Sequence, residues 1–223
     1  MPIRTVPLRN GEYYHIYNRG VAYLPTYTRK RDYERFLLSL AYYRHNNFPC
    51  KLSRFLQLPK ELQEEIQTTL NKKNNYCVSV ICYTLMPNHF HLLLRQETDN
   101  GISTYMTHLI NSYTRYFNTK HNRVGPVYQG VFKAVHIETD EQLLHLSRYI
   151  HLNPLVSGII TEKEFLQFPW SSLPYYLQKD TGIIDSSPVL DHFRSRKKYL
   201  QFVLDQTKYG KELEKIKHLI LEK

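Results

Sequence analysis

The sequence predicts an α+β fold: a ferredoxin-like antiparallel sheet with helices packed on it, an α-helical insertion and a helical C-terminal tail. Three observations support this class. The 223 residues are 42% hydrophobic and 22% charged, a balance typical of folded globular chains. Strand-like and helix-like segments follow one another as β-α-β-β-α-β-α, which is the split βαβ order up to the last helix. No apolar run approaches the roughly 20 residues that cross a bilayer, so no membrane partner is expected.

The first 44 residues predict a strand followed by a helix. Residues 12–18 (EYYHIYN) are rich in β-prone aromatic residues and lie between Gly11 and Gly20, which indicates a strand. Apolar residues recur at helical spacing over 32–44, which predicts a helix. The polar stretch 46–75 carries a short helical pattern of its own and is predicted to be an insertion.

A β-hairpin and a second long helix come next. Residues 76–85 (YCVSVICYTL) and 89–96 (HFHLLLRQ) are apolar or β-branched, and the Met-Pro-Asn turn at 86–88 separates them. This pattern predicts two antiparallel strands. Residues 102–119 place apolar and aromatic side chains on one helical face, which predicts a helix.

The last strand and the following helix complete the predicted sheet. Residues 131–138 (VFKAVHIE) indicate a strand, and residues 140–152 a helix that ends at Asn153-Pro154. We therefore expect one domain over 1–173 and a basic helical tail over 174–223, with its final helix around 194–223.

Charge and cysteine usage narrow the partners and the compartment. Thirty Lys and Arg against twenty Asp and Glu give a net charge of +10, and 19 tyrosines accompany it, which favours a polyanionic partner such as nucleic acid. Cys50, Cys77 and Cys82 form no CxxC pair, so free thiols in a reducing compartment are expected. The N-terminal residues show no apolar core of a secretory signal, and a cytoplasmic location is predicted.

His89-Phe90-His91 is the first candidate for chemistry. On a strand, side chains alternate between faces, so both imidazoles point the same way while Phe90 points to the other face. Two neutral imidazoles on one sheet face form half of a divalent-metal site. A strand that carries two histidines without binding metal is the alternative.

Tyr149 and Asn153 are the second candidate, because a spacing of four residues places both side chains on one helical face. A metal held by His89, His91 and the Asn153 amide oxygen would lie beside the Tyr149 hydroxyl. The alternative is a core tyrosine followed by a helix C-cap asparagine. Tyr42 and Tyr43 also have asparagine four residues on, so the spacing alone leaves both interpretations open.

Six motifs in order resemble a known family. They lie between residues 12 and 173: HIYNRG, MPNHFHLLL, YTRYFN, GPVYQGVFK, LSRYIHLNPLVSG and PWSS. The set is similar to the HUH single-strand transposases with one catalytic tyrosine, and among them to the REP-associated tyrosine transposases. The resemblance implies that His89, His91 and Asn153 hold Mg²⁺ or Mn²⁺ and that Tyr149 is the nucleophile. The insertion at 46–75 and the chain beyond Tyr175 depart from the family pattern.

The resemblance implies a metal-dependent single-stranded DNA endonuclease and strand transferase. Its expected substrate is hairpin or palindromic repeat DNA, and its expected intermediate is a 5′-phosphotyrosine. Rejoining needs no ATP, which suits a sequence without GxxxxGK[ST]. A non-catalytic nucleic-acid-binding regulator on the same fold and a metal-dependent nuclease that uses water are the alternatives. A monomer is favoured over a homodimer.

The basic and aromatic stretch 112–133 is the predicted DNA contact. Its cations could follow the phosphates, and its exposed aromatic rings could stack on unpaired bases. Tyr113 and Phe117 also share an apolar stripe, so a place in the core is equally open for them. The residues predicted to bind DNA are Arg115, Lys120, Arg123 and Lys133.

Overall fold

A four-stranded antiparallel sheet forms the middle layer of the molecule. The structure is a computed structural model, and it describes residues 7–72, 75–178 and 182–205. The strands are arranged in the order β2-β3-β1-β4, and each pair of neighbours is antiparallel. This order confirms the ferredoxin-like expectation. The strands are β1 (Tyr13–Arg19), β2 (Val78–Met86), β3 (His89–Gln96) and β4 (Lys133–Ile137).

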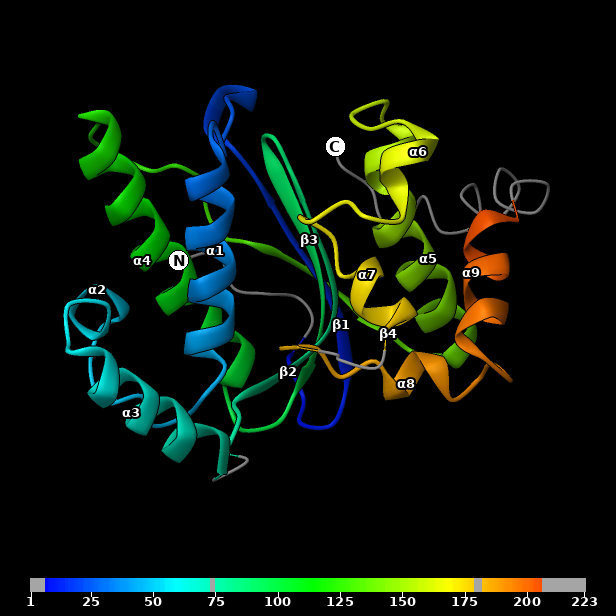
Figure 1. Cartoon of the computed structure of the whole chain (residues 1–223), viewed down its shortest axis with the longest axis horizontal. Helices are drawn as coiled ribbons and strands as arrows, with labels where there is room; N and C mark the ends of the chain where they lie inside the picture. The colour runs from blue at the N-terminus through cyan, green and yellow to red at the C-terminus, as the bar shows by residue number, and fades with distance from the viewer. Residues whose placement is uncertain (1–6, 73–74, 179–181, 206–223) are drawn as a thin grey trace.

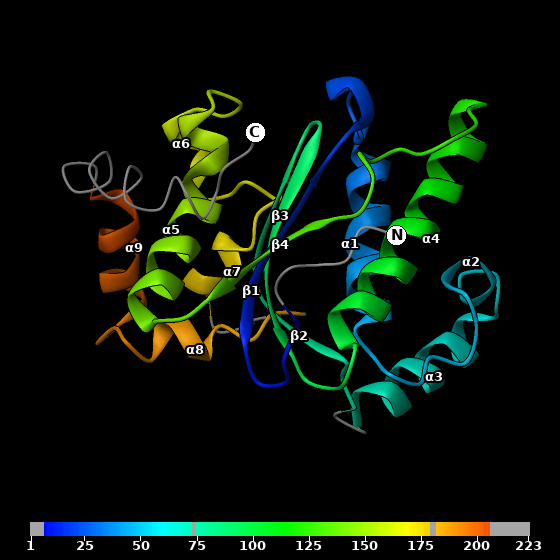
Figure 2. The ribbon, with the colours of Figure 1, turned by 180° about the vertical axis from the view of Figure 1, so that it is seen from behind.

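Helices cover both faces of the sheet (Figures 1 and 2). Helices α1 (Lys30–Tyr43) and α4 (Gly101–His121) are the two crossover helices, and they lie together on one face. Helix α5 (Asp140–Val156) lies on the opposite face, with α7 (Leu173–Leu177) and α9 (Arg196–Leu204) beside it. The sheet therefore separates two helical layers, and each layer is reached by alternate side chains of every strand.

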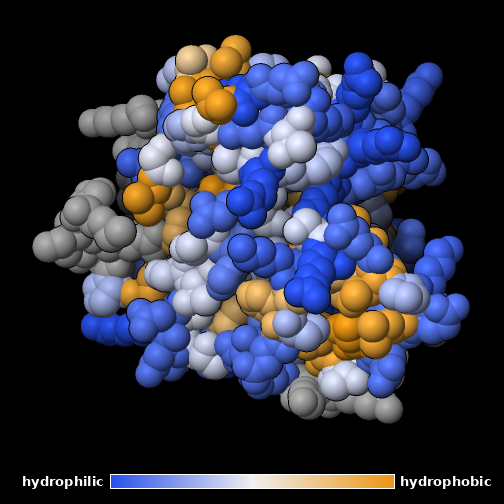
Figure 3. Space-filling model, turned by 90° about the vertical axis from the view of Figure 1, so that its left-hand side faces the viewer, coloured by the Kyte–Doolittle hydropathy of each residue, from blue (hydrophilic) through white to orange (hydrophobic). Residues whose placement is uncertain are grey.

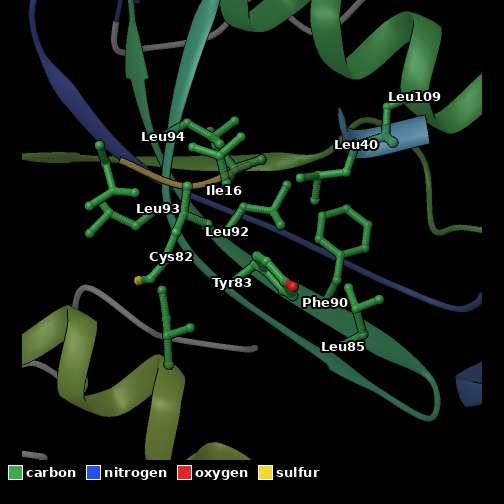
Figure 4. Close-up of a cluster of buried hydrophobic side chains, with 14 of the residues drawn as sticks. Ile16, Leu40, Cys82, Tyr83, Leu85, Phe90, Leu92, Leu93, Leu94 and Leu109 are labelled. Atoms are coloured by element: carbon green, nitrogen blue, oxygen red, sulfur yellow. The ribbon is translucent and has the colours of Figure 1, made fainter. Parts of the chain in front are cut away.

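Strand β3 shows how the sequence divides its side chains between the two layers. Phe90 points toward α1, where its ring lies 5.2 Å from that of Phe36. His91 points the other way, and its ring lies 5.4 Å from that of Tyr149 on α5. The close-up in Figure 4 shows the same alternation, with Leu93 on the opposite side of the strand from Phe90. The period of two that predicted a shared face for His89 and His91 is thus present.

The predicted insertion forms two helices that pack beside α1. These are α2 (Leu52–Phe55) and α3 (Lys60–Lys72). Leu52 and Phe55 are buried, and the Phe55 ring lies 4.9 Å from that of Tyr42 on α1. The segment therefore extends the core on the α1 side and adds a wall beside α1 and α4.

Helix α5 is longer than the sequence indicated. We expected it to end at Asn153-Pro154, but it continues through Pro154 to Val156, and its C-cap is Ser157. Proline lacks the N–H that would bond to the carbonyl four residues back, and its ring crowds that carbonyl, but a helix can continue past it at a cost. Asn153 is consequently a residue of the helix body, and the C-cap interpretation of Asn153 is wrong.

The described residues beyond Leu173 pack against α5. His151 of α5 accepts or donates a hydrogen bond through each ring nitrogen, with Nδ1 2.7 Å from Tyr199 Oη and Nε2 2.8 Å from Ser172 Oγ. Burial lowers the pKa of His151 to about 3, so its ring is neutral in the folded protein. The remaining short helices are α6 (Glu162–Phe165) and α8 (Ser187–Leu190), and the rest of the predicted final helix, 206–223, lies outside the described residues.

Two further observations concern the cysteines and the lengths of the helices. Cys50, Cys77 and Cys82 are free thiols, and the last two are buried. Within the described ranges, no helix has the length and apolar character to cross a membrane.

Asp32 is a buried carboxylate that ties α1 to α4, and it makes stability depend on pH. It accepts hydrogen bonds from Thr28, from Tyr116 at 3.0 Å and from Lys120 Nζ at 2.5 Å. Burial alone would raise the pKa of Asp32, but these bonds lower it from 3.8 to about 2.

Because the folded-state pKa of Asp32 is depressed, its contribution is present above pH 4 and is lost as pH falls toward 2. The shift corresponds to about 2 kcal/mol of unfolding free energy. We expect Asp32→Asn to destabilise the protein by that order at pH 7 and the difference from wild type to shrink as pH falls. Urea denaturation of both proteins at pH 7 and pH 3 measures this. A difference that does not change with pH would contradict it.

Candidate functional site

Two histidines of β3 form one wall of the candidate site. His89 and His91 lie on the same face of the strand, and their ring centroids are 5.0 Å apart. His89 is partly exposed and His91 is completely buried. Nδ1 of His89 lies 2.7 Å from the side-chain oxygen of Asn88, which orients the ring. Solvent therefore reaches the histidine pair from the His89 end.

Helix α5 supplies the second wall with Tyr149 and Asn153. The Tyr149 ring meets that of His91 edge to face at a centroid distance of 5.4 Å. A side-chain hydrogen bond joins Tyr149 to Asn153, one turn further along the helix. Tyr149 is partly buried and Asn153 is 7% exposed. The structure thus brings together all four residues that the two spacings selected.

Strand β1 adds side chains that the sequence argument did not select. Nε2 of His15 lies 2.9 Å from Nδ1 of His91, so one of these nitrogens donates to the other. The two rings are stacked, and the Tyr17 ring lies 6.0 Å from that of His91. In the β1–β3 register, Arg19 is directly opposite His89. The alternation of His15, Tyr17 and Arg19 in HIYNRG is the signal that could have placed them on the histidine face.

Burial and the nearby arginine set the protonation of the site. Burial lowers the pKa of His89 to about 4, with a further contribution from the positive charge of Arg19. Burial also lowers the pKa of His91 well below its usual value, and its protonation is further opposed by coupling to His15 and His89 and by the positive charge of Arg19. Burial raises the pKa of Tyr149 to about 12, although its hydrogen bond with Asn153 and the charge of Arg19 act in the opposite direction. At neutral pH, His89 and His91 are therefore neutral imidazoles and Tyr149 is a protonated phenol.

The donor set has the chemistry of a small metal site. Neutral imidazole is the form of histidine that binds metal, and an amide oxygen suits a hard divalent cation. In both histidines Nδ1 already has a partner, the arrangement that fixes a ligand ring so that Nε2 faces the ion. Within residues 7–72, 75–178 and 182–205, no group of three or more His, Cys, Asp or Glu side chains could hold a metal. A site on His89 and His91 accordingly depends on the Asn153 oxygen or on the substrate for its remaining ligands.

The four cations predicted to bind DNA are spread over two layers. Arg115 and Lys120 lie on α4, which covers the sheet face opposite to α5. Lys120 is engaged with buried Asp32. Arg123 follows α4, with its guanidinium 5.7 Å from the Phe117 ring, and Lys133 begins β4 opposite Tyr17. Of the four, Lys133 is the one whose strand partner belongs to the face of the candidate site.

Two aromatic residues of the predicted DNA stretch belong to the core. Tyr113 is fully buried and Phe117 is 3% exposed, and the Tyr113 hydroxyl donates to the carbonyl of Thr26. Stacking of bases on these two rings is therefore excluded by their burial. The apolar stripe that these two residues share on the predicted helix correctly indicated a place in the core.

Comparisons with known proteins identify a family for this chain. The family model described as "Transposase IS200 like" matches residues 41–153, just over half of the chain, and this range contains His89, His91, Tyr149 and Asn153. A search of curated proteins found no match. A solved REP-associated tyrosine transposase bound to a REP hairpin is similar at 15% identity and a TM-score of 0.46, over 78% of this chain and 84% of that one. The extent of the family match shows that the chain belongs to the IS200-like transposases.

Proposed function

We propose that the protein is a metal-dependent endonuclease and strand transferase for single-stranded DNA, with Tyr149 as its nucleophile. The observation that carries this proposal is the contact of Tyr149 with His91 and Asn153 beside the exposed edge of His89. Family membership supports a DNA-processing role. The motifs shared with REP-associated members favour hairpin or palindromic repeat DNA as the substrate, and a monomer as the acting unit.

One divalent cation, Mg²⁺ or Mn²⁺, fits the proposal. Nε2 of His89, Nε2 of His91 and the side-chain oxygen of Asn153 would hold it. When bound, the ion polarises the scissile phosphate and offsets the negative charge that builds on its oxygens. Asn153 would then serve two purposes, since it also positions the Tyr149 hydroxyl.

The proposed cleavage reaction attaches the DNA covalently to the protein. Tyr149 Oη forms a bond to phosphorus while the bond from phosphorus to the 3′ oxygen breaks, which leaves a 5′-phosphotyrosine and a DNA 3′ end. The phenol loses its proton and the departing 3′ oxygen gains one. Because the phosphoester is conserved, the 3′-hydroxyl of another strand can attack the phosphotyrosine and restore the nucleophile without ATP.

Arg19 is placed to bind the phosphate beside His89. It is opposite His89 in the sheet, and its charge acts on His89, His91 and Tyr149. Guanidinium pairs well with a phosphate through two parallel hydrogen bonds. We expect Arg19→Gln to slow single-turnover cleavage on the order of 10–100-fold, and Arg19→Lys to restore part of the rate.

Arg95→Gln is the matched control for Arg19→Gln. Arg95 lies at the other end of β3, opposite Tyr13, and is remote from the histidine pair in the register. Its substitution should leave the cleavage rate within twofold of wild type. Equal losses for Arg19→Gln and Arg95→Gln would indicate general electrostatic attraction and remove the specific role of Arg19.

DNA binding through Arg115, Lys120, Arg123 and Lys133 remains part of the proposal. Lys and Arg contacts to phosphates release counterions, so binding should weaken steeply with salt. The division of these residues between two layers implies a long DNA path that passes the β1–β4 edge near Lys133. Lys120 is the weakest of the four candidates because Asp32 neutralises its charge.

A covalent capture assay tests the function and separates the two alternatives. The protein is incubated with a labelled single-stranded hairpin and Mn²⁺, with and without a chelator, and resolved on a denaturing gel. We expect a chelator-sensitive protein–DNA adduct. Cleavage without an adduct would favour a nuclease that uses water, and binding with neither cleavage nor adduct would favour a regulator.

A further inference from the structure

A groove lies on the opposite helical layer from Tyr149. Its volume is about 710 Å³, and α1, the start of the insertion and α4 contribute its lining. Figure 3 views the side of the molecule that carries α2, α3 and α4, where strongly hydrophilic side chains lie directly beside hydrophobic ones. This volume is within the range of small-molecule sites. None of the residues proposed for DNA cleavage lines it.

The floor of the groove contains a buried arginine, Arg35, that has no carboxylate partner among the described residues. The Arg35 side chain is 8% exposed, and its guanidinium lies 5.6 Å from the centre of the Tyr116 ring. Nη2 donates a long hydrogen bond of 3.5 Å to Ser112 Oγ. Nε and Nη1 are buried and have no hydrogen-bond partner in the part of the chain that the structure describes. A buried guanidinium with unsatisfied N–H groups is costly, so an anion that binds there gains more than it would at the surface.

Positively charged side chains line the groove around Arg35. Lys51, Arg115 and Lys120 also line the groove, and its lining contains no Asp or Glu. Among the described residues, Asp32 pairs with Lys120, but no carboxylate lies within ion-pair distance of Arg35, Lys51 or Arg115. Three cations therefore face a groove that supplies no compensating charge.

The remaining wall of the groove is aromatic and aliphatic. His108 is exposed and stacks on the buried ring of Tyr43, with ring centroids 5.6 Å apart, and Leu56 of the insertion is 41% exposed. Planar, weakly polar groups bind well against such a wall. A ligand that suits both parts of the groove carries a flat ring at one end and an oxyanion at the other.

We propose that this groove binds one nucleotide, with its phosphate at Arg35 and its base against His108 and Leu56. The nucleotide is either a free nucleotide or one unit of a single strand. Binding of a single strand here rests on the proposed function. Nε and Nη1 lie beneath the surface, so the guanidinium rotates toward the groove on binding. A strand held here is anchored on the layer opposite to the cleaved phosphate.

Calorimetric titration with deoxyadenosine monophosphate, a four-nucleotide single strand, deoxyadenosine and inorganic phosphate tests the proposal. We expect the monophosphate to bind at least tenfold more tightly than deoxyadenosine or phosphate, and Arg35→Gln to weaken its binding on the order of tenfold or more. If only the tetranucleotide binds, and Arg35→Gln weakens that binding to the same extent, the nucleotide in the groove belongs to a single strand and is not a free nucleotide. Arg95→Gln, on β3, is the matched control and should bind like wild type.

Two further groove variants test the proposal even if Arg35→Gln fails to fold. Lys51→Gln removes a groove cation on the insertion, and Leu56→Asp places a negative charge on an exposed wall residue; both should weaken nucleotide binding. Wild-type affinity in all three groove variants would overturn the proposal, as would inorganic phosphate that binds as tightly as the monophosphate. At saturating DNA, Arg35→Gln should still form the covalent adduct. The experiments therefore distinguish an error in the groove proposal from an error in the role of Tyr149.

Discussion

Tyr149→Phe is expected to abolish the covalent protein–DNA adduct and to leave DNA binding intact. The substitution removes the only atom of this side chain that can attack phosphorus and keeps the ring that packs against His91. Loss of the hydrogen bond with Asn153 should cost about 1 kcal/mol of unfolding free energy, too little to unfold the domain. Adduct formation on a labelled hairpin, together with an affinity measurement on the same DNA, checks both parts.

Tyr17→Phe is the matched control for Tyr149→Phe. Tyr17 is a second tyrosine beside His91, with its ring 6.0 Å away, and it is also partly buried. Burial raises the pKa of Tyr17 too, so both phenols are protonated at neutral pH. We expect Tyr17→Phe to keep adduct formation. The reverse pattern would mean that the chemistry is correct and the nucleophile is Tyr17.

His89→Ala should reduce adduct formation by about 100-fold or more, because the scissile phosphate is no longer polarised. His89 is partly exposed, so its removal should disturb the core less than removal of buried His91. The same variant should lose Mn²⁺ binding in a calorimetric titration without DNA. This second readout separates a metal ligand from a residue that merely shapes the site.

His136→Ala serves as the control for His89→Ala. His136 is a partly buried histidine of β4 that bonds to Glu12, and it is paired with Tyr14 rather than with a residue of the site face. Its substitution should leave Mn²⁺ binding and adduct formation near wild-type levels. Equal losses in both variants would show that the effect is on folding, and unchanged Mn²⁺ binding in His89→Ala would remove His89 from the ligand set.

The local part of the fold could be predicted from the sequence. The apolar run in HFHLLLRQ predicted the observed bounds of β3, His89–Gln96, because a strand that is buried on both faces carries apolar residues on both. The end of α5 was predicted wrongly at Pro154. A helix whose apolar face is packed against a sheet can absorb the one lost hydrogen bond, and sequence alone does not reveal that packing.

The site was predictable where one strand or one helix carries both members of a pair. His89 with His91 and Tyr149 with Asn153 are such pairs, and the fold brings them together. His15 and Arg19 were missed because their proximity depends on the register between β1 and β3, whose paired residues here are 70 or more positions apart in the chain. Arg35 was missed for the same reason, since the insertion, α1 and α4 together form its groove.

The measurement that tests the central claim most directly is the identification of the DNA-linked residue. Wild-type protein is reacted with a single-stranded hairpin in the presence of Mn²⁺, the DNA is trimmed to one nucleotide, and the peptides are mapped by mass spectrometry. The account predicts a nucleotide linked through its 5′ phosphate to Tyr149, and no modified peptide after addition of chelator. A nucleotide on any other residue, or complete cleavage of the hairpin without a modified peptide, would contradict it.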